Sequence, residues 1–226
     1  MKQGVLNFHF IKESDVTVCI SEKNFFAFNA INSWPNWSNN LLYIYGPKDC
    51  GKSLILNMWK VKSRSSNLNL DFFNDLSFLK NLKSLEEKKC WSIDNIDKII
   101  SNDNEEKILN VINILKSNDS SLLITSSKSP KELKCKLDDL LSRLNSSIVA
   151  EVKQPDESLI KEIIKRKLEI REIIIDDKNL DFLVKRMERT YSNAIKISEM
   201  IDKKSLEEHS NISKRLFRKI LEELEL

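Results

Sequence analysis

The chain has 226 residues, of which 41% are hydrophobic and 31% charged, and its formal net charge is +3. This composition indicates a folded globular chain of one to two domains and excludes an intrinsically disordered one. The mild charge does not indicate a dedicated DNA binder, which usually carries a basic stripe. No apolar run approaches the roughly 18 residues of a membrane span, and the start MKQGVLNFHF is too polar for a signal peptide. Because the four cysteines are also widely spaced, we expect a cytoplasmic protein without a membrane partner.

Strands and helices are predicted to alternate along the first two thirds of the chain. Residues 1–14 show little periodicity and predict a tail. Short apolar runs predict strands at 41–45, 68–72, 90–94, 121–126 and 148–152. Helices are predicted from Lys52 to about Lys62, and around Ile108, Val111, Ile112 and Leu115, which share one face. The alternation indicates crossover connections, and therefore an α/β fold with a mostly parallel sheet.

The pattern changes at Gln154-Pro155-Asp156, where proline disfavours helix for the residue before it and Asp156 predicts a helix N-cap. Beyond this point apolar residues recur at helical spacing. The groups are Ile160, Ile163 and Ile164; then Leu180, Leu183, Val184 and Met187; then, after a predicted Ser213 cap, Phe217, Ile220, Leu221 and Leu224. We therefore predict a tail at 1–14, an α/β domain at 15–153 and a small helical domain at 154–226.

A phosphate-binding loop is predicted between the first strand and the helix that follows it. The chain contains only three glycines, and two of them, Gly46 and Gly51, fit the pattern G-x-x-x-x-G-K-S. Glycines let the backbone aim its N–H groups at phosphate oxygens, while Lys52 reaches the β/γ-phosphates and Ser53 ligates Mg²⁺. The predicted nucleotide contacts are Gly46, Pro47, Lys48, Asp49, Cys50, Gly51, Lys52, Ser53 and Leu54. The alternative is an ordinary turn before a helix.

An acidic residue at the end of another strand is needed to hold Mg²⁺ beside such a loop. Asp94 in CWSIDNID is the candidate, and the alternative is a helix-capping aspartate. Many ATPases of this class place a second acid next, to activate water, but this chain has Asn95. An amide cannot accept a proton, so we predict weak intrinsic ATPase activity unless Asp97 substitutes.

Several stretches together resemble one family, the DnaA-related AAA+ proteins, and within it the Hda-like regulatory inactivators of DnaA. The resemblance covers nearly the whole chain and rests on SWPNW (33–37), LLYIYGPKDCGKS (41–53), SIDNID (92–97), LLITSSKSPKEL (122–133), LDDLLSRL (137–144) and LVKRMERTYSNAIKISEMIDKKSL (183–206). It implies an AAA+ domain followed by a helical lid. The Ile-Asp-Asn form of the second motif is more similar to Hda than to DnaA, which usually carries two acids there. Because the sequence ends after the expected lid, we expect no C-terminal DNA-binding domain of the kind that an initiator has.

The resemblance also implies roles for individual residues. Arg143 matches the arginine-finger position, from which Hda-like proteins act on ATP bound to DnaA; the alternative is a structural salt bridge at a helix end. The first sensor position, often acidic in relatives, falls on Ser127, and the second falls on Ser192. Arg189 lies one helical turn earlier and is either a phosphate contact or a solvated residue. These departures suit a protein that holds one nucleotide, ADP more than ATP, as a structural cofactor.

The N-terminal stretch Gln3-Gly4-Val5-Leu6-Asn7-Phe8 reads Q-x-x-L-x-F, which is similar to the peptide that docks on the DNA polymerase III sliding clamp, its β subunit. Leu6 and Phe8 then enter an apolar groove while Gln3 makes hydrogen bonds. The alternative is a strand with alternating Leu6, Phe8 and Phe10.

Three functions remain. The first is a regulator that inactivates DnaA, docks on the clamp and contacts DNA only through it. The second is a helicase loader or remodelling ATPase that uses its own ATP, and the third is a passive adaptor. Self-association is left open, because AAA+ modules range from monomers to filaments.

Overall fold

Two units make up the part of the chain that the computed structural model describes, which is residues 9–13, 16–100, 104–208 and 214–223. One unit is Asn24–Lys153, and the other joins the described residues up to Lys23 with those from Gln154 onward. Among the described residues no helix combines the length and the apolar character needed to cross a membrane.

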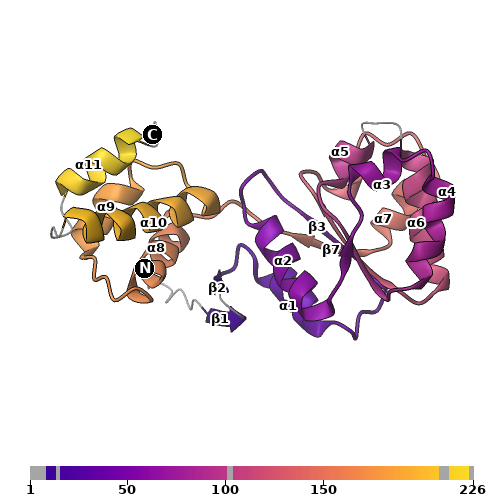
Figure 1. Ribbon diagram of the computed structural model, residues 1–226, viewed down its shortest axis with the longest axis horizontal. Coiled ribbons are helices and arrows are strands. Elements are labelled where there is room, and N and C mark those ends of the chain that lie inside the picture. The colour runs from indigo at the N-terminus through magenta and orange to yellow at the C-terminus, as the bar shows by residue number, and fades with distance from the viewer. Residues whose placement is uncertain (1–8, 14–15, 101–103, 209–213, 224–226) are drawn as a thin grey trace, which may run out of the picture. The chain divides into compact units, whose positions relative to one another are not determined.

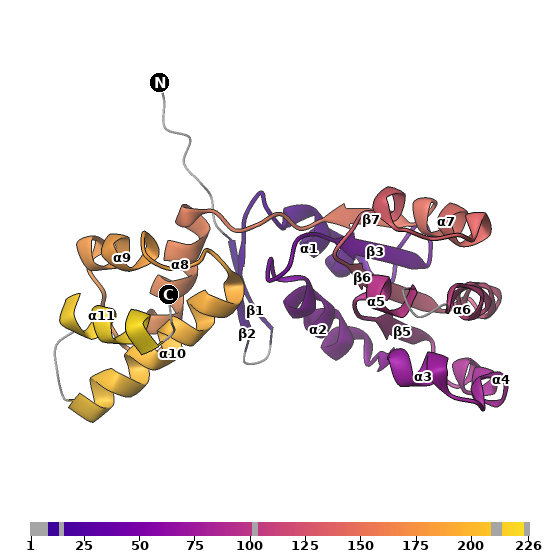
Figure 2. The same ribbon diagram turned by 90° about the horizontal axis from the view of Figure 1, so that it is seen from above.

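The first unit is built on a five-stranded parallel sheet in the order β4-β5-β6-β3-β7 (Figures 1 and 2). Its strands are β3 (Leu41–Tyr45), β4 (Ser66–Asn67), β5 (Cys90–Ile93), β6 (Ser121–Ser126) and β7 (Ile148–Glu151). Its helices are α1 (Phe25–Ser33), α2 (Lys52–Ser63), α3 (Leu70–Asn74), α4 (Phe78–Asn81), α5 (Ile96–Ile100), α6 (Glu105–Ser117) and α7 (Asp138–Asn145), with 3-10 turns at Leu82–Glu86 and Pro130–Glu132. Helices α1 and α2 lie on one side of the sheet and α5, α6 and α7 on the other (Figure 1).

The core of this unit lies on both faces of the sheet. The central strands are continuously apolar because helices cover both faces of the sheet. In β3, for example, Leu42, Tyr43 and Ile44 are all fully buried. The predicted apolar face of α6 is buried against the sheet as well. The predicted parallel α/β architecture is confirmed, and with it the strands at 41–45, 90–93, 121–126 and 148–151.

The strand predicted at 68–72 is wrong. The strand in this region is only Ser66–Asn67, and helix α3 begins at Leu70. Asn69 is the N-cap of α3, and its side-chain oxygen accepts a hydrogen bond from the backbone N–H of Phe72 at 3.1 Å. A short helix with an Asn69 cap therefore forms where the alternating apolar residues predicted a strand.

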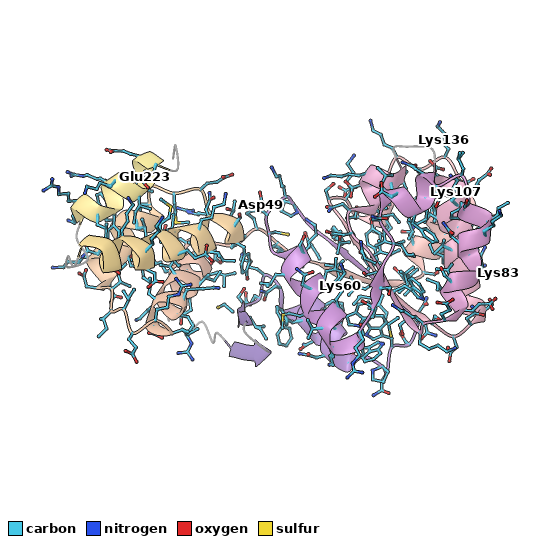
Figure 3. The ribbon with its side chains drawn as sticks, viewed as in Figure 1. Asp49, Lys60, Lys83, Lys107, Lys136 and Glu223 are labelled. Atoms are coloured by element: carbon cyan, nitrogen blue, oxygen red, sulfur yellow. The ribbon has the colours of Figure 1, made fainter. Side chains whose placement is uncertain are left out.

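The second unit consists of helices α8 (Glu157–Glu169), α9 (Asp177–Val184), α10 (Tyr191–Glu208) and α11 (Lys214–Glu223), with a strand pair. Asp156 caps α8 as predicted, because its carboxylate accepts a hydrogen bond from the Leu159 N–H at 2.9 Å. The apolar groups predicted from the sequence are buried wherever they fall within the described residues. Lys204 of α10 forms an ion pair at 2.5 Å with Glu223 of α11, and Glu223 is labelled in Figure 3. Ser213 and Leu224 lie outside the described residues.

The N-terminal segment differs from the predicted tail. Residues 9–13 form strand β1 (His9–Glu13), which pairs antiparallel with β2 (Val16–Ile20) in a sheet of its own. Strand β2 packs against α8, and the Tyr191 hydroxyl at the start of α10 donates to the Cys19 carbonyl at 3.4 Å. The described residues up to Lys23, predicted to belong partly to the tail and partly to the α/β domain, therefore group with the helices.

Candidate nucleotide-binding site

Three segments meet at the carboxyl edge of the parallel sheet. The loop Gly46–Gly51 follows β3, Asp94 follows β5, and Ser127 follows β6. Strands β5, β6 and β3 are consecutive neighbours in the sheet, so the three segments lie side by side. This edge is where open α/β sheets bind their ligands.

The loop before α2 has the backbone conformation that its glycines allow. Gly51 has φ of 104°, and Asp49, at the exposed tip of the loop (Figure 3), has φ of 58°. A Cβ atom at Gly46 would lie 2.0 Å from the carbonyl oxygen of Val152, so no side chain fits there. The Gly46 N–H donates to the Ser126 carbonyl at 3.3 Å. These contacts fix the start of the loop against the ends of β6 and β7.

The Lys52 side chain folds back over this loop. Its Nζ donates to the carbonyl oxygens of Gly46 at 2.8 Å and of Pro47 at 2.7 Å, and the residue is 7% exposed. Among the described residues no carboxylate pairs with this ammonium group, and the first turn of α2 contains no acid. A buried positive charge next to a helix N-terminus without a counter-ion fits a phosphate group.

The other loop residues divide into exposed and buried positions. Pro47, Lys48 and Asp49 are exposed, as is Ser53 in the first turn of α2, and Leu54 is half-buried. Cys50 is fully buried, and burial raises the pKa of its thiol although the nearby Lys52 ammonium opposes that effect. The thiol therefore fills space beneath the loop.

Asp94 is held by Thr125, a residue that is not among the predicted site residues. The hydroxyl of Thr125, which is fully buried on β6, donates to Asp94 Oδ1. The same hydroxyl oxygen accepts from the Asn95 N–H at 2.9 Å, and Asn95 has φ of 54°. The signal in the sequence is one hydroxyl side chain within the otherwise apolar run LLIT. Ser53 and Asp94 carry hard oxygen atoms of the kind that Mg²⁺ takes together with nucleotide phosphates, and they are the residues that would hold this ion. No group of three metal-binding side chains is found within the described part of the chain.

Asp97, in the first turn of α5, faces the end of β6. Its carboxylate accepts hydrogen bonds from the Ser127 hydroxyl at 2.8 Å, the Ser127 N–H at 3.1 Å and the Ser126 hydroxyl at 3.2 Å. Burial raises the pKa of Asp97, but these hydrogen bonds outweigh burial and the net shift is downward. A carboxylate stabilised in this way is a weak proton acceptor, which disfavours Asp97 as a substitute for the missing second acid.

Arg143 lies far from this edge of the sheet. It is in the last turn of α7, which leads into the amino end of β7 through Ser146 and Ser147. The parallel sheet thus places Arg143 at the edge opposite the phosphate loop. Arg143 is half-buried, and none of the described residues forms an ion pair with its guanidinium.

The second-sensor candidates lie in the helical unit. Arg189 is in the segment between α9 and α10, and its Nη2 pairs with Glu157 at 3.0 Å with half of the side chain exposed. Ser192 is an exposed residue in the first turn of α10. Arg189 therefore has an ion-pair partner within its own unit. The clamp-peptide residues Gln3, Leu6 and Phe8 lie outside the described residues.

Comparison of the sequence with known protein families matches residues 7–151 to the bacterial DnaA ATPase domain. An uncharacterized protein of Haemophilus influenzae is 29% identical over 189 residues, which is 79% of this chain and 80% of that protein. The replication initiator DnaA of Helicobacter hepaticus is 25% identical over 188 residues, which is 77% of this chain and 40% of the initiator. The chain thus spans less than half of the length of the DnaA initiator that it matches.

The fold is similar to that of solved DnaA structures. Domain III of Thermotoga maritima DnaA superposes with a TM-score of 0.77 at 20% identity, over 90% of this chain and 93% of that one. A DnaA bound to AMPPCP and single-stranded DNA gives a TM-score of 0.69 at 18% identity, over 80% of this chain and 62% of that one. The fold is therefore a parallel α/β AAA+ fold with a helical C-terminal part.

Proposed function

Because the chain belongs to the bacterial DnaA ATPase-domain family, we propose that it is a cytoplasmic, Hda-like regulator that inactivates the initiator DnaA. The protein holds ADP in its phosphate loop with Mg²⁺, docks on the sliding clamp, and contacts DNA only through that clamp. It then presents Arg143 to ATP bound on DnaA. The resulting hydrolysis converts the initiator to its ADP form and limits initiation of replication.

The placement of Arg143 is the observation that carries this proposal. A guanidinium at the amino edge of the sheet is separated by the whole sheet from the loop at the carboxyl edge, so it is unsuited to its own nucleotide. It is accessible and without an ion-pair partner among the described residues, so it is free to meet an anion on another protein. An arginine supplied in trans accelerates phosphoryl transfer by about 10³ to 10⁵.

The phosphate loop supports a bound adenine nucleotide. The uncompensated Lys52 ammonium and the positive-φ turn at Asp49 and Gly51 suit a diphosphate, and a DnaA of the same fold is bound to AMPPCP. The amide of Asn95 and the low pKa of Asp97 leave no strong base beside Asp94. The protein therefore keeps its nucleotide rather than turning it over.

Intrinsic ATP hydrolysis is expected to be slow, with a turnover well below about one per second. Asn95→Asp is expected to raise this turnover by about tenfold or more, since it restores an acid after Asp94 at a positive φ that Asp tolerates. Asp97→Asn is the comparison variant, and it is expected to leave the ATP turnover unchanged. Steady-state ATPase assays of the purified proteins measure both. Rapid turnover that Asp97→Asn abolishes would instead support the remodelling ATPase.

Clamp binding is expected to depend on the N-terminal peptide. The double substitution Gln3→Ala plus Leu6→Ala removes one hydrogen-bonding amide and one apolar anchor, so capture by the immobilised β clamp should fall to background. Lys12→Ala, outside the peptide, is the control and should bind as the unchanged protein does. Undiminished capture of the double variant would show that the peptide assignment is mistaken.

A reconstituted reaction tests the proposed function as a whole. DnaA is loaded with radiolabelled ATP and mixed with this protein in the presence of clamp loaded on DNA, and conversion to ADP is followed. We expect conversion to accelerate only when protein and clamp are both present. A passive adaptor binds the clamp and DnaA without accelerating the conversion, and that result would overturn the proposal.

A further inference from the structure

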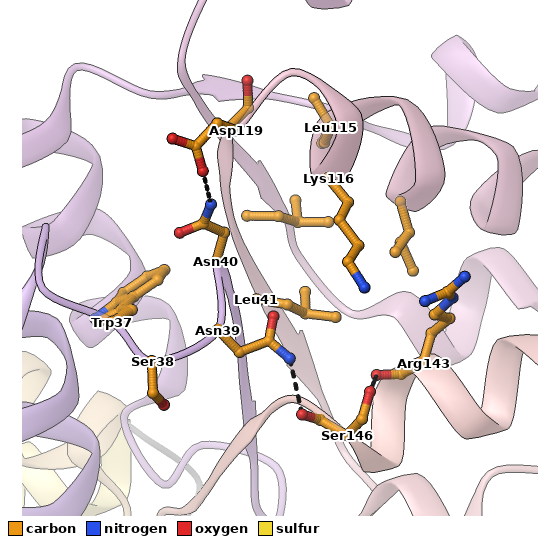
Figure 4. Close-up of a pocket in the computed structure, with 13 residues that line it drawn as sticks. Trp37, Ser38, Asn39, Asn40, Leu41, Leu115, Lys116, Asp119, Arg143 and Ser146 are labelled. Carbon is orange, nitrogen blue, oxygen red and sulfur yellow. Dashed lines mark hydrogen bonds between the residues drawn. The ribbon is translucent and has the colours of Figure 1, made fainter.

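A hollow lies at the amino edge of the sheet, away from the phosphate loop. It has a volume of about 530 Å³ and is lined by segments that precede β3, β6 and β7 together with the ends of α6 and α7 (Figure 4). Its apolar lining consists of buried side chains, among them Leu41, Leu115 and Leu122. The volume falls within the range of ligand sites, roughly 300 to 1,000 Å³.

Some of the polar side chains that line this pocket already have hydrogen-bond partners. Asn39 Nδ2 donates to the Ser146 carbonyl at 2.8 Å, and Ser146 Oγ donates to the Arg143 carbonyl at 2.9 Å. Asp119 supplies the one carboxylate among the residues that line the pocket, and it accepts a hydrogen bond from Asn40 Nδ2 at 2.5 Å. The one acid of the pocket therefore already has a hydrogen-bond donor.

Two cations in the pocket have no such partner. Lys116, in the last turn of α6, and Arg143, in the last turn of α7, extend their charged groups toward the same hollow (Figure 4). Within the described part of the chain neither group forms an ion pair or a side-chain hydrogen bond. Two like charges directed at one concave space repel each other, and an anion placed between them relieves the repulsion.

We propose that Lys116 is a second phosphate-contacting residue, which acts with Arg143 on the triphosphate of the ATP held by the partner. This inference rests on the proposed function, because it is the proposed target of Arg143 that identifies the anion. The Arg143 guanidinium offers a planar fork to two oxygens, while the Lys116 ammonium supplies a compact charge that neutralises a third. The protein's own nucleotide site is at the other edge of the sheet, so the phosphate comes from another chain.

The test is single-turnover hydrolysis of DnaA-bound ATP, measured over a range of concentrations of this protein with clamp loaded on DNA. Lys116→Ala should lower the plateau rate by about tenfold, which is the loss of one charge-assisted hydrogen bond in the transition state. Lys116→Arg should recover most of the rate. Lys60→Ala is the matched control, because Lys60 is also a lysine in the last turn of a helix, α2, outside this pocket (Figure 3), and it should leave the rate unchanged.

Each outcome separates this inference from the proposed function. A Lys116→Ala plateau equal to that of the unchanged protein, or a change only in the half-saturating concentration, overturns the phosphate contact while Arg143 keeps its role. If Arg143→Ala also has no effect, the proposed function itself is wrong. Lys116 is exposed, so thermal unfolding of Lys116→Ala should match that of the unchanged protein and verifies that folding is intact.

Discussion

Replacing Arg143 with alanine is expected to lower the stimulated hydrolysis of DnaA-bound ATP by about 10³-fold, close to the rate without the protein. The side chain is half-buried at the rim of a hollow and has no ion pair among the described residues, so the substitution removes charge without breaking an ion pair. Nucleotide and clamp binding should be unchanged, because both predicted sites are elsewhere in the chain. Conversion of labelled ATP to ADP measures the effect.

Two variants sharpen the Arg143 experiment. Arg143→Lys keeps the charge but loses the planar fork, so it should recover only a small part of the rate. Arg166→Ala removes an exposed arginine that pairs with Glu169 at 3.2 Å on α8, and it should behave as the unchanged protein. Full stimulation by Arg143→Ala would show that Arg143 is not the residue that acts on the ATP of DnaA, and it would overturn the role proposed for this arginine.

Replacing Lys52 with alanine is expected to weaken nucleotide binding by about 100-fold, which corresponds to roughly 2.7 kcal/mol. The Lys52 ammonium is 7% exposed and is held over the loop by the carbonyls of Gly46 and Pro47, so it meets the phosphates with little reorganisation. Isothermal titration with ADP, and the nucleotide content of the purified protein, both report the loss.

A lysine four residues earlier, Lys48, provides the comparison for Lys52. Lys48 belongs to the same loop but is exposed, so Lys48→Ala removes the same charge without removing the buried contact. We expect its ADP affinity to change by less than about threefold, as a screened surface charge does. Equal losses in the two variants would mean that net charge, and not the position of Lys52, controls binding.

The turn at residues 46–51 and the sheet could be predicted because their signals are local. LLYIY is an apolar run of strand length, and the two glycines before Lys52 stand out in a chain with so few. The position of Arg143, at the edge of the sheet opposite the phosphate loop, follows from the parallel topology. The alternation of strands and helices in the sequence already indicated that topology.

Other features could not be predicted because distant residues decide them. Thr125 and Asp94 are 31 positions apart and meet only when β5 and β6 pair. Strand β1 exists through its pairing with β2, and short strands of this kind carry little periodicity of their own. The apolar stretch at 68–72 is compatible with a strand and with a helix, and the hydrogen bond from the Phe72 N–H to the Asn69 side chain stabilises the helix. The sequence also gave no sign that Lys116 and Arg143 face one hollow.

The grouping of the first strands with the helices has a practical consequence for shortening this protein. Suppose that the chain is cut at Lys23 to isolate the α/β unit or the helices. The cut removes β2 from its contact with α8 and the Cys19 carbonyl from the Tyr191 hydroxyl, and it therefore exposes apolar surface on the C-terminal helices. Loss of solubility in such a fragment would then say nothing about the clamp peptide. A cut that stops before His9 removes the peptide and spares the hairpin on which the helices rest.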